Sequence, residues 1–383
     1  MGSIFTVHRG ADRPARHPRG WMAIAAGAVA ALAGCTTVSE SPVKPAGAPI
    51  VFPAPPDEAR FVYERTIYSS ADVVAEDASA DFRRAVTGEQ RSGEPLSKPY
   101  AIAAFRGKLY VSDTVARFVR VLDIPAGRYG RIGDEEGPGG LVKPVGLDVD
   151  AQGNLYVADI SQKVVLVYGP AGNFLRRIGG QKWFERLSSV TVDAAGTRVY
   201  AVDIGGVSSD RHQVRVFDAT TGEHLQDIGK RGNGPGEFNL PRDLAIGKDG
   251  RLYVVDGGNF RVVVFDREGR YLHAFGSVGK QYGQFARPKE IASDAEGNVY
   301  VVDTAFGNFQ IFNAEGELLL FVGDRSERDA PAKYMLPSGI SVDVDGRVYV
   351  VDQWFRKIDV FRPAGIKPEQ GFTARPRRAA SAR

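Results

Sequence analysis

A seventeen-residue pattern recurs in the second half of the chain and constrains the fold more than any other feature. It reads LPRDLAIGKDGRLYVVD at 240–256, RPKEIASDAEGNVYVVD at 287–303 and LPSGISVDVDGRVYVVD at 336–352. Its last five residues occur six times in related form, ending at Asp113, Asp159, Asp203, Asp256, Asp303 and Asp352. Successive aspartates lie 46, 44, 53, 47 and 49 residues apart, and a period of this length indicates a repeat architecture.

Each repeat has the composition of four short strands. In the fourth repeat the strand candidates are LAIG, RLYVVD, FRVVVFD and RYLHAFG, separated by the turn signals KDG, GGN and REG. β-branched and aromatic residues favour strands, and glycine-containing polar triplets favour tight turns. No segment of the repeat has a 3.6-residue period, which disfavours helical solenoids. Four antiparallel strands in one repeat form one blade of a β-propeller, so six repeats predict an all-β fold of six blades.

Residues 232–265, GNGPGEFNLPRDLAIGKDGRLYVVDGGNFRVVVF, resemble the NHL-repeat β-propellers along their whole length. The resemblance extends over about residues 95–362 and implies six four-stranded antiparallel blades around an axis. Other propellers of that family bind proteins or RNA.

The ring needs a device that closes it, because an open array would leave unpaired strand edges. The sixth repeat ends after its third strand, KIDVF at 357–361, whereas RFVYERTIY at 60–68 precedes the first repeat. We predict that this early segment is the outer strand of the sixth blade, within a propeller domain at 57–365. Alternation places Phe61, Tyr63 and Ile67 on one face. A short helix is expected within 78–90.

The first 35 residues have the pattern of an export signal. An arginine-rich start precedes WMAIAAGAVAALA at 21–33, which is too short for a membrane span of ~20 residues. Leu32-Ala33-Gly34-Cys35 resembles the lipobox of bacterial lipoproteins, and Cys35 is the only cysteine of the chain. The resemblance implies acylation of Cys35 after cleavage just before it. The alternative is an ordinary signal peptide with an incidental cysteine.

The segments that flank the expected propeller are read as a tether and a tail. Residues 36–56 contain six prolines and predict an extended tether. Residues 366–383 predict a basic, disordered tail. Thr36 after the cysteine favours, by the lipoprotein resemblance, the outer membrane. The expected location is therefore exported and lipid-anchored, facing the periplasm or the cell surface.

The charge distribution argues against nucleic acid as a partner. Residues 1–35 carry a net charge of +3 and residues 366–383 carry +4, so the segment between them carries −4. Binding to a phosphate backbone needs clustered lysine and arginine, which this net charge does not suggest.

The candidates for chemistry favour structural roles. The six aspartates end strands at turns, where a carboxylate accepts backbone N–H groups. DVDAQGN at 148–154 and DVDGR at 343–347 are too short for calcium loops and predict hairpin turns. His212, His224 and His273 are scattered over different repeats. We assign no catalytic residue, metal ligand or cofactor. A more distant resemblance to six-bladed lactonases keeps open an enzyme with axial Ca²⁺ or another divalent ion.

The remaining candidates for function lie on one face of the ring. Residues at the starts of the inner strands and in the turns after the aspartates share that face, where aromatic and arginine side chains are typical of binding hot spots. The predicted binding face comprises Tyr100, Trp183, Phe184, Ser189, Arg242, Asp243, Asn259, Phe260, Lys289, Glu290, Phe306, Ser338, Gln353, Trp354 and Arg356. The alternatives are that Phe306 and Trp354 pack over the blades, and that Arg242–Asp243 and Lys289–Glu290 are surface charge pairs.

The function that follows is a membrane-tethered binding or scaffold module for a cell-envelope protein, peptide or glycan. A neutral-to-acidic body and export argue against RNA. The alternative is a periplasmic metal-dependent hydrolase or lyase with an axial site.

Overall fold

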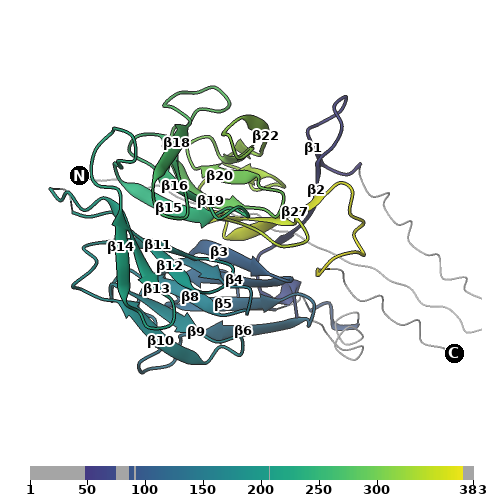
Figure 1. Cartoon of the computed structure of the whole chain (residues 1–383). Coiled ribbons are helices and arrows are strands. Elements are labelled where there is room, and N and C mark those ends of the chain that lie inside the picture. The colour runs from purple at the N-terminus through teal and green to yellow at the C-terminus, as the bar shows by residue number, and fades with distance from the viewer. Residues whose placement is uncertain (1–47, 75–85, 90–91, 207, 374–383) are drawn as a thin grey trace, which may run out of the picture. The chain divides into compact units, whose positions relative to one another are not determined.

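The chain folds into a six-bladed β-propeller in the computed structural model, which describes residues 48–74, 86–89, 92–206 and 208–373 (Figure 1). Each blade is an antiparallel sheet, and in blades one to five the strands run outward from the axis in chain order. The first three blades consist of β3 (Pro99–Phe105), β4 (Lys108–Asp113), β5 (Phe118–Asp123) and β6 (Arg128–Ile132); β7 (Pro144–Val149), β8 (Leu155–Asp159), β9 (Val164–Tyr168) and β10 (Phe174–Gly179); and β11 (Leu187–Val192), β12 (Arg198–Asp203), β13 (Gln213–Asp218) and β14 (His224–Ile228).

The second half of the ring repeats this order. Blades four and five consist of β15 (Pro241–Ile246), β16 (Leu252–Asp256), β17 (Arg261–Phe265) and β18 (Tyr271–Phe275); and β19 (Pro288–Ser293), β20 (Val299–Asp303), β21 (Asn308–Phe312) and β22 (Leu318–Val322). Blade six consists of β25 (Pro337–Val342), β26 (Val348–Asp352), β27 (Lys357–Pro363), β2 (Phe61–Ile67) and β1 (Val51–Phe52). Minor elements are η1 (Ser70–Asp72), β23 (Asp324–Arg325) and β24 (Lys333–Tyr334).

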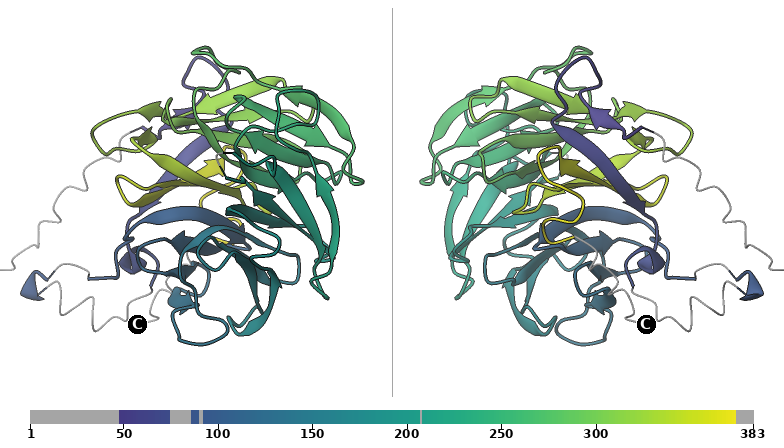
Figure 2. Two further views of the ribbon diagram at one scale, coloured as in Figure 1. Left: turned by 90° about the vertical axis from the view of Figure 1, so that its left-hand side faces the viewer. Right: turned by 90° about the vertical axis from the view of Figure 1, so that its right-hand side faces the viewer.

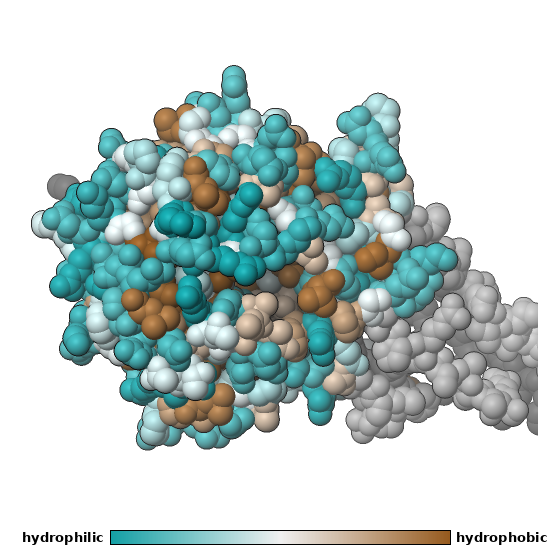
Figure 3. Space-filling model, viewed as in Figure 1, coloured by the Kyte–Doolittle hydropathy of each residue, from teal (hydrophilic) through white to brown (hydrophobic). Residues whose placement is uncertain are grey.

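The core of the propeller lies between neighbouring blades. Each inner strand contacts the next one around the ring, and β25 contacts β3 to complete the circle. Six clusters of buried apolar side chains each combine residues from two adjacent blades. The second strands of blades two, four, five and six, such as β16, are buried along their whole length, which explains their continuous apolar sequence. The outer surface is largely hydrophilic on the side shown in Figure 3.

The predicted closure of the ring is confirmed. β2 pairs antiparallel with β27, with Tyr63 opposite Phe361 and Ile67 opposite Ile358. Figure 2 shows the purple strand β2 next to β27, which lies near the yellow end of the colour range. The fold therefore depends on pairing between segments almost three hundred residues apart: the Thr66 hydroxyl donates to Asp359 across 293 positions.

The prediction that Phe61, Tyr63 and Ile67 share one face is wrong for Ile67. A β-bulge between Tyr63 and Arg65 inserts an extra residue and reverses the alternation. Phe61 and Tyr63 therefore pack between blades five and six, whereas Ile67 packs between blades six and one. The bulge lets one strand contribute to both neighbouring cores.

Several expectations fall outside the described residues, namely the signal at 1–35 with Cys35, most of the tether and the end of the tail. The helix expected at 78–90 falls there too, except for 86–89. Val51 and Phe52, within the range assigned to the tether, form the edge strand β1. Residues 366–373 contact blade six, where Arg347 donates to the Gln370 carbonyl at 2.9 Å. In the described part of the chain no helix has the length and apolar character of a membrane span.

The six repeated aspartates serve the blades, as predicted. All six are completely buried. One carboxylate oxygen of Asp303 accepts the amides of Ala286 and Arg287, which enter the inner strand, at 2.7 and 2.9 Å. The other oxygen accepts the amides of Ala305 and Phe306 in the turn after β20. Asp113, Asp159 and Asp352 repeat this four-amide pattern.

The segments that resemble calcium loops form hairpin turns between the first and second strands, as predicted. One oxygen of Asp150 accepts the amides of Gln152 and Asn154 at 3.0 and 2.8 Å, and the other accepts the Asn154 side-chain amide. Asp343 accepts the amides of Arg106 and Gly107 of the neighbouring blade, which ties blade six to blade one.

We predict that Asp303→Ala lowers the free energy of unfolding by about 3 kcal/mol or more, because it leaves four amides without their acceptor and each buried orphan costs about 1–3 kcal/mol. Chemical denaturation followed by circular dichroism measures the loss. Asp249→Ala, at a 40% exposed side chain in another turn, is the matched control and should change stability little. Equal stabilities of the two variants would contradict this role.

We predict that deletion of residues 57–68 lowers the melting temperature by roughly 10 °C or more. The deletion removes Phe61 and Ile67, worth about 1.5–3 kcal/mol each when buried, and leaves β27 as an open edge. A melting curve of the variant against the unaltered chain checks this. Ile67→Ala should give a smaller decrease and Val115→Ala, at a 62% exposed side chain, almost none. An unchanged melt of the deletion variant would exclude this closure.

Candidate binding site at the mouth of the axial channel

The axial channel contains two cavities that share a wall. The larger, of about 720 Å³, is lined by all six inner strands and by the turns that follow them. The smaller, of about 170 Å³, lies where the inner strands begin. Ser189, Asp243 and Glu290 border both cavities and form the constriction between them. Gly146 permits this constriction, because a Cβ atom there would lie 2.1 Å from the Ser189 hydroxyl oxygen.

A bulge at the start of each inner strand shapes the smaller cavity. In β15 the pairing shifts between Pro241 and Leu244, and in β19 between Pro288 and Ile291. In a regular strand consecutive side chains point to opposite faces, but inside a bulge two consecutive side chains can point to the same side. Arg242 with Asp243, and Lys289 with Glu290, therefore line the same cavity.

Two carboxyl groups form the inner wall of the smaller cavity. Asp243 accepts hydrogen bonds from the Ser189 hydroxyl at 2.5 Å and the Ile291 amide at 2.9 Å. Burial raises its pKa to about 6. Burial, together with the nearby charge of Asp243, raises the pKa of Glu290 well above its usual range. Within the described residues, Oε1 of Glu290 is buried without a hydrogen-bond partner, so it is free to bond a ligand.

Three cations surround the same cavity. The Lys289 ammonium lies 4.1 Å from the centre of the Tyr100 ring, and burial lowers its pKa to about 8. Burial lowers the pKa of Arg242, and the charges of Arg186 and Arg287 lower it further. In the described part of the chain the side chains of Arg242 and Arg287 form no ion pair or hydrogen bond. The charge pairs Arg242–Asp243 and Lys289–Glu290 considered from the sequence are therefore not formed as direct ion pairs.

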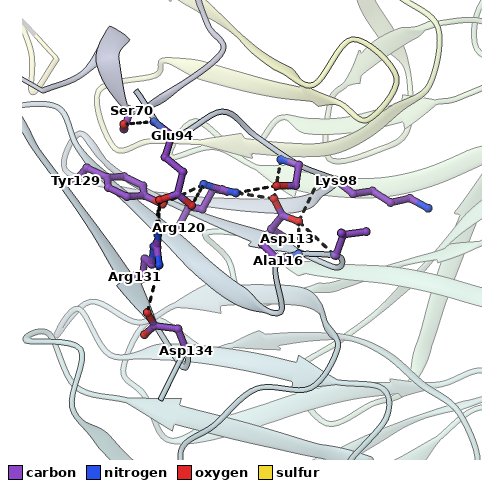
Figure 4. Close-up of polar contacts among 11 residues, drawn as sticks. Ser70, Glu94, Lys98, Asp113, Ala116, Arg120, Tyr129, Arg131 and Asp134 are labelled. Carbon is purple, nitrogen blue, oxygen red and sulfur yellow. Dashed lines mark hydrogen bonds and ion pairs between the residues drawn. The ribbon is translucent and has the colours of Figure 1, made fainter. Parts of the chain in front are cut away.

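Further cations surround the mouth because the repeat places them there. The second amide held by the blade aspartate belongs to Lys98, Lys143, Arg186 and Arg287 in four blades, and all four residues are exposed. Figure 4 shows this arrangement in blade one, where the Lys98 amide is bonded to Asp113 while its side chain points away from the Arg120–Glu94 network.

The turns after the aspartates add side chains at a conformational cost. Arg117, Lys163, Phe260 and Arg356 occupy equivalent positions with φ between 54° and 67°. The equivalent residue in blade five is Gly307, with φ 67°. A left-handed conformation costs a non-glycine residue about 1–2 kcal/mol. Phe260 packs against the core between blades four and five, and the Arg117 side chain donates to the Val142 carbonyl, so these two side chains also have structural contacts.

The structure brings together seven of the predicted site residues. Tyr100, Ser189, Arg242, Asp243, Phe260, Lys289 and Glu290 all line the smaller cavity. Trp354 is 62% exposed in the turn after β26 and Arg356 is exposed in the same turn, where Gln353 is half-buried. Phe306 is half-buried in the equivalent turn of blade five. Packing of Trp354 over its blade, the alternative considered from the sequence, does not occur.

The other predicted residues lie elsewhere or have internal roles. Trp183 stacks on His224 of the outer strand β14, with ring centres 4.2 Å apart, and lines neither cavity. Phe184 is buried between blades two and three. Ser338 donates to the Tyr100 carbonyl, and Asn259 donates to Asp256.

Sequence reasoning missed Arg186, Arg287 and the two exposed lysines of the mouth. The available signal was a lysine or arginine directly before the inner strand, in SKP at 97–99, VKP at 142–144 and ARP at 286–288.

Carboxyl groups line the channel, but the described residues do not bring them together as a set of metal ligands. Within the described residues no group of three histidine, cysteine, aspartate or glutamate side chains is placed to hold an ion. None of His212, His224 and His273 lines either cavity.

Comparison with known proteins supports the fold. A family model described as a 6-bladed beta-propeller, DUF5128, matches residues 206–273. The human E3 ubiquitin-protein ligase TRIM32 is 44% identical over 45 residues, which are 12% of this chain and 7% of that protein. Human NHL repeat-containing protein 3 is 42% identical over 40 residues, which are 10% of this chain and 12% of that protein. The alignments thus span about a tenth of either relative.

Solved structures agree on the architecture alone. A protein of unknown function from Bacteroides thetaiotaomicron is 20% identical with a TM-score of 0.57, and the match covers 79% of this chain and 75% of that one. A gluconolactonase from Xanthomonas campestris is 16% identical with a TM-score of 0.51, covering 79% and 98%. The fold and these matches together define a six-bladed β-propeller with NHL-like repeats. The lipoprotein character remains a prediction.

We predict that Asp243→Asn changes the pH dependence of stability. The raised pKa of Asp243 means that its folded form keeps a proton which the unfolded chain loses above its ordinary pKa of 3.8. Stability from this group is therefore present below about pH 4 and is lost as pH rises through about 6, by about 3 kcal/mol. Denaturant titrations should show that the free energy of unfolding of the variant increases relative to that of the unaltered chain between pH 4 and pH 7.

The matched control for this prediction is Asp266→Asn. Hydrogen bonds from the backbone hold the pKa of Asp266 below its usual value, so its neutral variant should lose stability relative to the unaltered chain as pH rises. Parallel pH profiles for Asp243→Asn and the unaltered chain would contradict the buried, proton-retaining state of Asp243.

Proposed function

We propose that the protein is a membrane-tethered binding module whose partner, a protein, peptide or glycan of the cell envelope, docks on the face that surrounds the channel mouth. The observation that carries this proposal is the set of unpaired cations at the mouth. Arg242 and Arg287 have no counter-ion among the described residues, and burial and mutual repulsion lower the pKa of Arg242. A partner that brings negative charge relieves this repulsion, and complementary charge also directs its approach.

Exposed apolar side chains on the same face support a docking role. Trp354 is 62% exposed, Val115 62% and Val142 38%. Val115 and Trp354 follow their blade aspartates by two residues, and the Val142 amide is held by Asp159, so all three lie with the cations. Tryptophan and arginine are the residues most often found at the energetic centre of protein interfaces.

The tether supplies the second part of the proposal. Acylation at Cys35 with a proline-rich linker would hold the propeller near a membrane without a spanning helix. A tethered module meets envelope partners at a high effective concentration, so modest affinity at the propeller face is sufficient.

A metal-dependent hydrolase is the second candidate, since carboxyl groups line the 720 Å³ cavity. However, the carboxyl groups of Asp148 and Asp343 are bonded to protein donors. Asp148 accepts the Thr191 hydroxyl at 2.5 Å and the Val192 amide at 3.0 Å, and Asp343 accepts three amides. The binding module is therefore the function that the geometry supports better.

We predict that Trp354→Ala and Arg242→Ala each reduce recovery of the envelope partner by about tenfold or more, since hot-spot residues contribute about 2 kcal/mol or more. Affinity capture from envelope extracts with the full-length chain, followed by quantitative mass spectrometry, measures recovery. Val344→Ala, at a 63% exposed side chain in a turn of the opposite face, and Arg128→Ala, at a 77% exposed side chain, are the controls. Equal recovery by all four variants would remove this face as the binding site.

A further inference from the structure

We propose that the smaller axial cavity is a carboxylate subsite, which receives one aspartate or glutamate side chain of an acidic protein segment. This inference rests on the proposed function and adds the chemistry of the partner. It follows from the charge around the cavity, its size, the carboxyl groups in its wall and the apolar surface at its rim.

The charge around the cavity selects an anion. Arg242, Arg287 and Lys289 all line it, and none has an ion-pair partner within 4.0 Å in the described part of the chain. Both arginines have exposed side chains that reach solvent at the mouth. Guanidinium groups bind carboxylates through paired hydrogen bonds, so two arginines at one opening form a receptor for a carboxylate rather than a diffuse positive surface.

The size of the cavity selects a small group. About 170 Å³ accommodates a body the size of a side chain, since an engineered cavity of about 150 Å³ holds one benzene molecule. Longer parts of a ligand must remain outside, over the mouth. The ligand is therefore a protruding acidic group on a larger partner, in contact with the surrounding face.

The inner wall selects a single negative charge. Glu290 is 6% exposed and its Oε1 has no partner among the described residues, while burial and the nearby charge of Asp243 raise the pKa of its carboxyl well above the usual range and so favour the protonated form. A protonated carboxyl can donate a hydrogen bond to an entering carboxylate. Asp243, with its pKa of about 6, is largely ionised at neutral pH and repels a doubly charged phosphate more strongly than a singly charged carboxylate.

The rim favours a protein segment over an acidic polysaccharide. Val115, Val142 and Trp354 expose apolar surface on the same face as the exposed Lys98, Lys143 and Arg186. Cations and apolar side chains on one face complement a chain that carries both acidic and apolar side chains, whereas a polyuronate offers charge with hydroxyl groups. We therefore commit to an acidic, partly apolar protein segment as the occupant.

Fluorescence anisotropy with a labelled peptide of alternating aspartate and leucine, capped at both ends, tests the subsite on the full-length chain. Arg242→Gln and Arg287→Gln should each raise the Kd at least about tenfold, the effect of losing one charged hydrogen-bonding partner. Arg128→Gln carries the same charge change at a 77% exposed side chain beside Asp123 and should leave the Kd unchanged. The matched asparagine–leucine peptide should bind as weakly to the unaltered chain as the acidic peptide binds to the arginine variants.

Three results would overturn the inference. The first is an acidic-peptide Kd that neither arginine variant changes. The second is equal binding of the asparagine peptide, which would show that apolar contact alone accounts for affinity. The third is tighter binding of an oligogalacturonate than of the acidic peptide, which would assign the mouth to a glycan. If any of these results occurs while capture of the envelope partner still depends on Trp354, the carboxylate subsite is excluded but the binding face is not. If capture of the partner is also independent of Trp354, the binding face is excluded as well.

Discussion

The fold depends on one repeated interaction, the buried carboxylate that ends the second strand of each blade. In blade five Asp303 holds two amides of the turn after β20 with one oxygen and two amides of the incoming connection with the other. This single group fixes where a blade begins relative to its own second hairpin. Because the amides it holds belong to residues of the channel mouth, the same interaction also determines where Lys98, Arg287 and their equivalents project.

The number of blades and the closure could be predicted from sequence because they follow from counting. A fixed period gives the blades, and a missing fourth strand in the last repeat requires a donor, which β2 supplies. The predictions that were wrong concern places where the structure departs from the regular repeat. Alternation assumes an unbroken pleat, but the bulge after Tyr63 turns Ile67 to the opposite core. The prediction that Trp183 belongs to the binding face is not supported, because its ring packs on His224 of the outer strand. The position of a residue along a connection does not reveal its distance from the axis.

The candidate site shows why net charge is a poor guide to a repeat protein. The central segment is net negative, yet its repeats place cations at equivalent positions of one face. Sequence reasoning found Arg242 and Lys289 because it followed the inner strands, and it overlooked Arg287, one residue before such a strand. The carboxyl groups of Asp243 and Glu290 lie behind these cations, at the constriction. Opposite charges are thus arranged along the axis in layers, which no composition count resolves.

Closure by β2 also means that blade six can form only after the last strands of the propeller have been synthesised. Translation delivers residues 61–67 early and residues 357–363 near the end, yet the Thr66–Asp359 hydrogen bond joins the two. At about 5–20 residues per second, β27 is synthesised roughly 15–60 s after β2. During that interval Phe61 and Ile67, which are buried in the folded chain, lack the partner strand β27. A chain that ends before residue 357 lacks β27 and therefore leaves β2 without the strand that it pairs with in the complete propeller.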